Sequence, residues 1–191
     1  MNKFDDIKIV LASSSPSRKL LLERAEIDFT VVVSGVDEDT PASFSPKQTV
    51  ECLAERKADA VLDQCGDSVV IASDSMVSFD DLIIGKPADL EDAKKTLHML
   101  SGQTHKVYTG VCIAYRGKKE VFSQFTDVLF YDLTDEEIDE YTESGESFGR
   151  AGSYGIEGKG VTLIKSINGD YSNIVGLPVA ETLRKIKAII E

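Results

Sequence analysis

The sequence contains no tryptophan, only two histidines and three cysteines, and fewer basic than acidic residues. Its cysteines, Cys52, Cys65 and Cys112, form no CxxC pair, so reduced thiols are expected rather than a zinc site or a disulfide framework. His98 and His105 are isolated, which leaves no histidine cluster for a metal ion. Lysines and arginines number 21 against 33 acidic residues, giving a formal charge of −12. Such a charge repels nucleic-acid backbones, so no nucleic-acid partner is expected.

Long apolar runs are also absent. No stretch approaches the ~20 consecutive apolar residues that a membrane-spanning helix needs, so no membrane partner is expected. The N-terminal stretch MNKFDDIKIV carries acidic residues and leads into a strand, which argues against a signal peptide and favours a cytoplasmic protein. What the chain does have is a 42% share of apolar residues over 191 positions. That is enough to bury the core of one domain over 1–191, with two lobes.

Apolar stretches and turn residues predict helices and strands in mixed order. Strands are expected over 7–12, 28–33, 68–73, 105–115 and 120–131, and helices over 16–25, 46–63, 89–100 and 178–190, with one more helix from Thr134. Helices alternate with strands early and a long hairpin follows, which favours an α/β or α+β fold with a mixed sheet. A cleft between the two lobes is the natural binding site in such a fold.

The segment LASSSPSRKL carries polar residues into the start of the first helix. Ser15 is expected to cap this helix and Pro16 to occupy its first turn. The free N–H groups and the dipole of a helix start attract anions, and Ser13 adds a hydroxyl donor. The guanidinium of Arg18 fits phosphate oxygens. Either an anion lies here, or the helix is simply capped and Arg18 and Lys19 are solvated; the segment alone favours neither.

Charged residues at three further positions have either a structural or a functional explanation. Asp74 is predicted at the end of a buried strand, where it either binds Mg²⁺ and activates water or caps a turn. The loop GVDED at 35–39 offers carboxylates for Mg²⁺, or it is an acidic surface loop. Lys57 falls on the apolar face of the helix over 46–63, so it either extends to solvent or meets a buried anion.

Two glycine-containing segments complete the set. IIGKP at 83–87 holds Lys86 between a glycine turn and a proline. AGSYGIEGKG at 151–160 either turns sharply or brings its backbone close to another group. The P-loop, the GxGxxG motif and the nucleophile elbow are absent. An anion-binding helix start, carboxylates for a divalent cation and fixed lysines together favour phosphate chemistry on a small substrate.

These segments identify a resemblance to the Maf family, also called septum formation inhibitor proteins, which are nucleoside triphosphate pyrophosphatases. The resemblance covers LASSSPSRKLLL, VDE at 36–38, ERKADAV at 55–61, IASDSMV at 71–77, and the segments at 83–111, 151–160 and 169–178. It implies a fold like that of inosine triphosphate pyrophosphatases: an elongated α/β protein with a mixed, curved sheet and a deep cleft between two lobes. It also implies hydrolysis between the α and β phosphates with Mg²⁺, Mn²⁺ or Co²⁺, and a homodimer.

The resemblance also implies residue roles. Substrate contacts are expected from Ser13, Ser15, Arg18, Lys57, Lys86, Thr104 and Glu157. The expected catalytic residues are Glu38, Asp74 and Lys86, with Glu38 and Asp74 as metal ligands and Asp74 as general base. Retained carboxylates favour turnover over the alternative of a non-catalytic, nucleotide-binding regulator of septum formation or cell division.

The base preference depends on two departures from the family pattern. Ser17 replaces the first arginine of the Ser-Pro-Arg-Arg motif of dTTP- and UTP-preferring members. Glu157 replaces their usual glutamine and matches the 7-methyl-GTP branch. An ionised glutamate offers only acceptors, which favours bases with N–H donors such as guanine or cytosine. Because the other motifs resemble the dTTP/UTP branch, we expect a pyrimidine nucleotide, with 7-methyl-GTP as the alternative.

Overall fold

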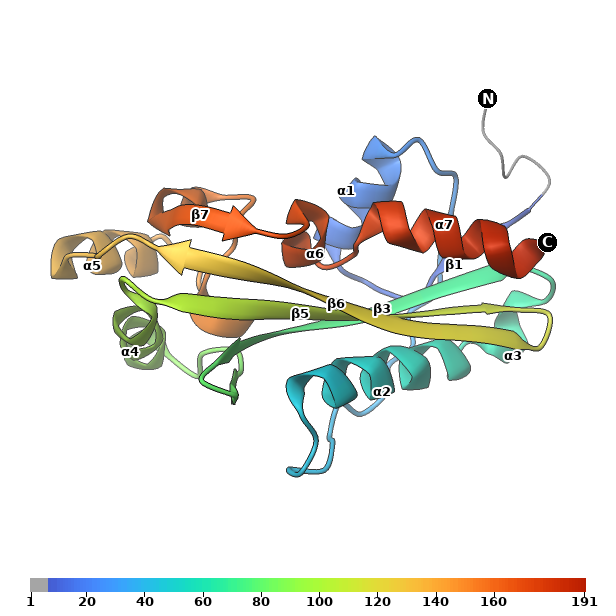
Figure 1. Cartoon of the computed structure of the whole chain (residues 1–191), viewed down its shortest axis with the longest axis horizontal. Helices are drawn as coiled ribbons and strands as arrows, with labels where there is room; N and C mark the ends of the chain where they lie inside the picture. Colours follow the sequence, from blue (N-terminus) through green and yellow to red (C-terminus); the bar gives the residue numbers. More distant parts are fainter. Residues whose placement is uncertain (1–6) are drawn as a thin grey trace. The chain divides into compact units, whose positions relative to one another are not determined.

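The computed structural model describes residues 7–191 (Figure 1). Residues 1–6, part of the stretch that argues against a signal peptide, lie outside the described residues. The strands are β1 (Ile9–Leu11), β2 (Thr30–Val31), β3 (Val69–Phe79), β4 (Leu82–Ile84), β5 (Thr104–Tyr115), β6 (Lys118–Phe130) and β7 (Ile164–Asn168). The α-helices are α1 (Pro16–Arg24), α2 (Pro46–Asp59), α3 (Leu62–Cys65), α4 (Leu90–Leu100), α5 (Asp135–Glu143), α6 (Tyr171–Val175) and α7 (Val179–Ile190). Two 3₁₀ helices are η1 (Ala151–Ser153) and η2 (Lys159–Leu163).

The seven strands pair in the order β2-β1-β3-β5-β6-β7, with β4 on β3. Strand β1 is parallel to both β2 and β3. In contrast, β4 is antiparallel to β3, and β7 is antiparallel to β6. The sheet is therefore mixed, which confirms the predicted α/β class.

Two tight turns form hairpins, and the second of them is the long hairpin that the sequence predicts. Asp80 and Asp81 connect β3 to β4 and have φ angles of 49° and 62°. Arg116 and Gly117 connect β5 to β6 and have φ angles of 47° and 79°. Positive φ at both central residues is the requirement of the type I′ turn, whose twist matches that of the flanking strands. The turn chemistry of the sequence thus sets both hairpins.

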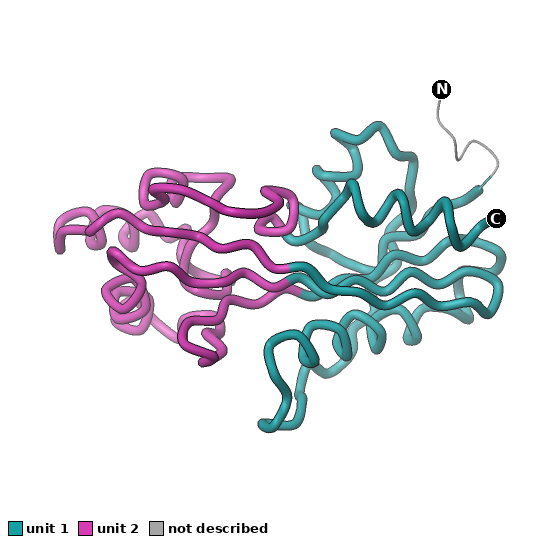
Figure 2. The backbone as a smooth tube through the Cα atoms, viewed as in Figure 1, with its two compact units in different colours: residues 1–74, 109–124, 176–191 teal, residues 75–108, 125–175 magenta. Residues whose placement is uncertain are grey.

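The chain divides into two compact units (Figure 2). The first unit contains residues 1–74, 109–124 and 176–191, and the second contains 75–108 and 125–175. A core of mostly small residues, including Ala54, Ala58 and Cys112, lies in the first unit. Larger side chains, including Leu97 and Phe130, form the core of the second. The prediction of a single two-lobed domain with a cleft stays a prediction.

In the first unit, α2 and α7 cover opposite faces of the strands (Figure 1). The side chains of β6 alternate between these helices, as the two-residue period of a strand requires. Glu120 accepts a hydrogen bond from Lys185 of α7 at 2.7 Å, whereas the neighbouring Lys119 pairs with Asp59 of α2 at 2.6 Å. Neighbouring residues of β6 therefore contact the two helices on opposite faces of the sheet.

Two predicted boundaries are wrong. Strand β3 does not end at Asp74 but continues to Phe79, because Met76 and Val77 are buried and the segment pairs with β4. The predicted helix over 46–63 ends at Asp59, and a separate short helix, α3, follows. The first correction matters for function because it places Asp74 inside a rigid strand.

Candidate active site

The start of α1 is organised by two serines. Ser15 caps the helix: its hydroxyl accepts from the backbone N–H of Arg18 at 3.4 Å. The buried Ser13 accepts from the Ser15 backbone N–H at 3.2 Å. Serine and proline at these positions are the sequence features that begin a helix here.

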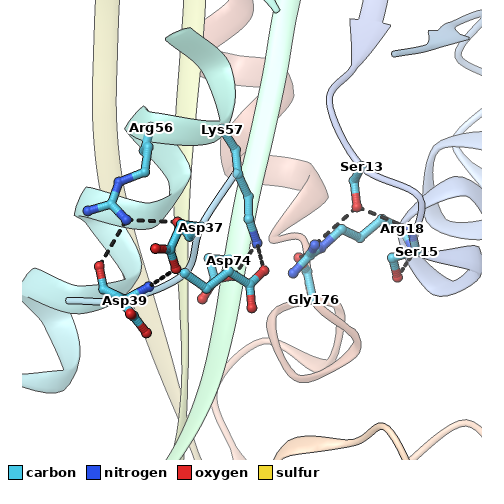
Figure 3. A network of polar contacts seen from close by, with 10 residues as sticks. Ser13, Ser15, Arg18, Asp37, Asp39, Arg56, Lys57, Asp74 and Gly176 are labelled. Carbon is cyan, nitrogen blue, oxygen red and sulfur yellow. Dashed lines mark hydrogen bonds and ion pairs between the residues drawn. The ribbon is translucent and has the colours of Figure 1, made fainter. Parts of the chain in front are cut away.

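Arg18 is held in place rather than solvated (Figure 3). Its Nη1 donates to Ser13 Oγ at 3.1 Å, and its Nε donates to the Gly176 carbonyl at 2.9 Å. Burial lowers the pKa of Arg18, while the negative charges of Asp74 and Glu38 oppose that lowering. Guanidinium groups remain protonated in proteins, so Arg18 is a fixed cation near two carboxylates. The alternative of a solvated Arg18 is excluded.

Lys57 joins these two carboxylates. Its Nζ lies 2.6 Å from Asp74 Oδ1 (Figure 3). The same Nζ lies 2.6 Å from Glu38 Oε1. The side chains of Lys57 and Asp74 are only 11% and 12% exposed, whereas that of Glu38 is 54% exposed. The lysine on the apolar face of α2 therefore meets a buried anion, which is the second of the two alternatives its position left open.

The acidic loop is positioned by Arg56 of α2. Its Nη1 donates to the backbone carbonyls of Asp37 and Asp39 at 2.8 and 2.9 Å. Asp39 N–H in turn donates to Asp37 Oδ1 at 2.9 Å. These bonds fix the backbone on both sides of Glu38, so consecutive residues of one helix position the loop and bind its carboxylate.

The donor set fits a divalent cation. Glu38 and Asp74 both bind the cationic Nζ of Lys57. Mg²⁺ is bound in proteins by one or two carboxylates, with water and substrate phosphates as the remaining ligands. Within residues 7–191 no group of three or more histidine, cysteine or acidic side chains is arranged to hold a metal ion. Two carboxylates suffice only where a phosphate substrate completes the coordination.

Three further predicted site residues lie in the second unit. Lys86 and Thr104 are exposed, and Glu157 is partly buried. The Gly85 carbonyl beside Lys86 accepts from the Gly152 N–H at 3.1 Å, so the IIGKP segment is tied to the glycine-rich loop. No hydrogen bond or ion pair joins Lys86, Thr104 and Glu157 to one another within the described chain.

The sequence interpretation assigned no role to Ser73, Gly176 or Arg56. The Gly176 carbonyl accepts from Ser73 Oγ at 3.1 Å as well as from Arg18. Sequence reasoning could not find the Gly176 carbonyl, because a backbone acceptor does not depend on the side chain. The only indication is the glycine itself, whose φ of 119° is rarely adopted by other residues. Arg56 stands beside Lys57 in the quoted ERKADAV segment, but nothing in the segment shows which loop it binds.

The cysteines and His105 remain outside this cluster. The cysteines are free thiols, and burial raises the pKa of Cys65 and Cys112, the latter to about 12. These two thiols are therefore poor nucleophiles at neutral pH. His105 is buried, and its Nε2 lies 2.7 Å from Tyr154 Oη. Its ring also packs edge-on against Phe130 and Tyr154, so His105 is a packing residue of the second unit.

The chain is similar to proteins of one family over nearly its whole length. A family model described as Maf-like protein matches residues 8–189. A dTTP/UTP pyrophosphatase of Bacillus cereus is 48% identical over 180 residues, which cover 94% of each chain. Proteins of the same name from Bacillus cytotoxicus and Bacillus anthracis are 47% and 46% identical over the same coverage. The chain belongs to the Maf-like protein family.

A solved structure, the Ham1 protein of Staphylococcus aureus, is also similar to this chain. It matches with a TM-score of 0.44 and 18% identity, over 65% of this chain and 72% of that one. The mixed sheet itself, rather than this partial likeness, establishes the α/β class. No helix within residues 7–191 is both long and apolar enough to span a bilayer.

Proposed function

We propose that this protein hydrolyses dTTP and UTP between the α and β phosphates, releasing the nucleoside monophosphate and pyrophosphate. Relatives named dTTP/UTP pyrophosphatase, 46–48% identical over 94% of the chain, support this activity. The observation that carries it is the cluster in which Lys57 Nζ binds Glu38 and Asp74 beside a fixed Arg18. Fixed cations beside a buried carboxylate and a more exposed one suit the binding of a charged triphosphate and the activation of the water that attacks it.

The cations have the first role in the proposal. Arg18 holds a fixed positive charge at the N-terminus of α1, where backbone N–H groups also favour an anion. Ser13 and Ser15 add hydroxyls there. Lys57 and Lys86 supply the remaining positive charge for the triphosphate. As the α–β bond breaks, charge grows on the leaving pyrophosphate, and fixed cations stabilise it without reorganisation.

Asp74 is the proposed general base. Its Oδ1 accepts from Lys57, which leaves Oδ2 to take a proton from water as that water attacks the α phosphorus. Burial and the strand backbone of β3 hold this carboxylate in one position. Glu38, at the edge of the cluster, is more exposed and contributes as a ligand rather than as a base.

The proposed cofactor is Mg²⁺, Mn²⁺ or Co²⁺ held by Glu38 and Asp74. When bound, such an ion neutralises phosphate charge and lowers the pKa of coordinated water. Lys57 would then leave at least one of the two carboxylates and turn to a phosphate. The flexible lysine stem permits this exchange, because its ammonium is a point charge without a fixed fork geometry.

Base recognition is assigned to Thr104 and Glu157. Uracil and thymine each present an N–H donor between two carbonyl acceptors. An ionised Glu157 accepts from that N–H but offers no donor to a neighbouring carbonyl. The same acceptors suit guanine, so 7-methyl-GTP is the second candidate substrate. A cytoplasmic location and a homodimer are also part of the proposal, and the homodimer is carried over from the family resemblance.

The test is product analysis with purified protein and Mg²⁺ or Mn²⁺ on dTTP, UTP, CTP, GTP and 7-methyl-GTP. We expect monophosphate and pyrophosphate from dTTP and UTP, and a loss of at least about 100-fold in kcat for the Asp74→Asn variant. Circular dichroism verifies that this variant is folded. Preferential turnover of 7-methyl-GTP favours the second candidate substrate. Nucleotide binding without turnover by folded protein contradicts the proposed activity and favours a regulator.

A further inference from the structure

The glycine-rich loop over 151–160 is tied at its base by the carboxylate of Glu146. Glu146 Oε2 accepts from the backbone N–H of Lys159 at 2.8 Å, and Glu146 Oε1 accepts from that of Gly160 at 3.2 Å. Tyr141 Oη donates to the same Oε1 at 3.3 Å and accepts from the Gly155 N–H at 3.2 Å. The Glu146 carboxylate and the Tyr141 hydroxyl thus hold the segment from Gly155 to Gly160 at both of its ends.

Between these ties the loop forms a tight turn. The Gly158 N–H points to the Gly155 carbonyl at 3.4 Å, so the turn encloses only Ile156 and Glu157. A Cβ on Gly158 would overlap the Glu146 carboxylate, and a Cβ on Gly160 would lie 2.5 Å from the Gly155 carbonyl oxygen. Gly160 is therefore required because the loop approaches its own backbone there, whereas a side chain on Gly158 would displace the Glu146 carboxylate.

Glu146 and Glu157 differ in what they bind. Both oxygens of Glu146 are occupied by donors from the protein. Within the described residues, the side chain of Glu157 has no hydrogen-bond or ion-pair partner, so its acceptors are available for a ligand. Glu157 itself adds no bond that would hold the turn in place. The position of its carboxylate depends on the ties beneath it.

We propose that Glu146 is a positioning residue for base selectivity: by binding the N–H groups of Lys159 and Gly160, it fixes the turn that presents Glu157 to the nucleotide base. This inference rests on the proposed function, because it assumes that Glu157 contacts the base. Tyr141 completes the arrangement by tying Gly155 at the other end. Displacing a recognition group by about 1 Å is enough to reduce its contribution strongly.

The main variant is Glu146→Gln, which keeps the size of the side chain. The N–H groups of Lys159 and Gly160 bind different oxygens of Glu146, and glutamine has only one oxygen to offer them. We expect the ratio of kcat/KM between preferred and disfavoured bases to fall by about fivefold or more, mainly through KM. Glu140→Gln, on the exposed side of α5, is the matched control and should leave the ratio unchanged. In a Glu157→Ala background, Glu146→Gln should produce little further loss, since both changes remove the same recognition.

Hydrogen exchange of the loop separates the failure of this inference from the failure of the proposed function. In Glu146→Gln, the amides of Lys159 and Gly160 should exchange at least about tenfold faster, while the amides of the strands stay protected. Unchanged exchange at these two amides overturns the inference whatever the enzyme does. Faster exchange with an unchanged base ratio, or an additive loss in the Glu157→Ala background, overturns the positioning role. A wild-type protein without hydrolytic activity refutes the proposed function, and with it the selectivity role.

Discussion

At the scale of single residues, Lys57 is the cation that joins the two carboxylates of the site. A lysine on the apolar face of α2 is buried only because Asp74 and Glu38 each lie 2.6 Å from its Nζ. Arg18 contributes a second positive charge close by. Breaking a buried ion pair from one side leaves the other charge desolvated without a partner, which is the costly arrangement.

Replacement of Lys57 tests this balance. We expect Lys57→Met to lower the free energy of unfolding by about 3 kcal/mol, because Asp74 and Glu38 lose their shared cation. The double variant Lys57→Met with Asp74→Asn should recover part of that loss. Urea denaturation measures both. Lys119→Met, at a more exposed pair with Asp59, is the control and should cost less than about 1 kcal/mol. Equal losses in the two lysine variants would show that the cluster is not a buried ion pair.

Glu157 allows a second test at this scale. Glu157→Gln supplies an N–H donor to a carbonyl of uracil or thymine while keeping one acceptor for the ring N–H. We expect kcat/KM for dTTP and UTP to rise about tenfold, since each added hydrogen bond in a recognition site is worth about 1.4 kcal/mol. Steady-state kinetics on dTTP, UTP and GTP measure the change. A fall for dTTP and UTP would contradict the assignment of Glu157 to base recognition.

At the scale of elements, α2 carries Lys57 and Arg56 and must lie close to the sheet. Gly110 of β5 makes that approach possible, because a Cβ there would overlap the backbone carbonyl of Val50 in α2. The capping box of Ser45 and Gln48 fixes where the helix begins. Gly110 thus permits the close approach of α2, and the Ser45 cap sets its start; both contribute to the position of Lys57.

Gly110→Ala therefore tests the packing of α2 on β5. The added methyl group meets backbone, which cannot rotate away as a side chain can. We expect a loss of about 2–3 kcal/mol in the free energy of unfolding and reduced hydrolysis through the displaced Lys57. Gly85→Ala is the control for stability, because a Cβ there meets nothing within 4 Å. Similar unfolding curves for the two variants would contradict a close contact between α2 and β5.

At the scale of the whole molecule, the sequence predicts most helices and strands and names the charged residues of the site, but not the contacts between them. The cap at Ser15, the helix start after Thr134 and the long hairpin of β5 and β6 act locally, so pattern and propensity suffice to find them. The convergence of Asp74 and Lys57 could only be left open, since it depends on long-range packing. The continuation of β3 beyond Asp74 was missed because a charged residue resembles a strand end until its partner is known.

Stability against pH is a property of the whole fold, and the buried His105 contributes to it. Burial lowers the pKa of His105 from 6.5 to about 4. The unfolded chain therefore binds this proton more readily than the folded one, and its contribution destabilises the fold as pH falls from about 6.5 to about 4. The full difference is worth about 3 kcal/mol.

His105→Gln isolates this contribution from that of the carboxylates. Urea unfolding between pH 7.5 and 4.5 should show a shallower loss of stability in the variant than in the wild type. The two curves should converge towards low pH. Curves that remain parallel over the whole range would contradict the burial of a neutral His105.

The position of water attack is the most direct test of the central claim. Hydrolysis of dTTP in ¹⁸O-labelled water, followed by mass spectrometry of both products, identifies the phosphorus that is attacked. A water activated by Asp74 at the α phosphorus places the label in dTMP and leaves the pyrophosphate unlabelled. Label in the pyrophosphate, or products of dTDP and phosphate, would contradict the proposed role of the Lys57, Glu38, Asp74 and Arg18 cluster.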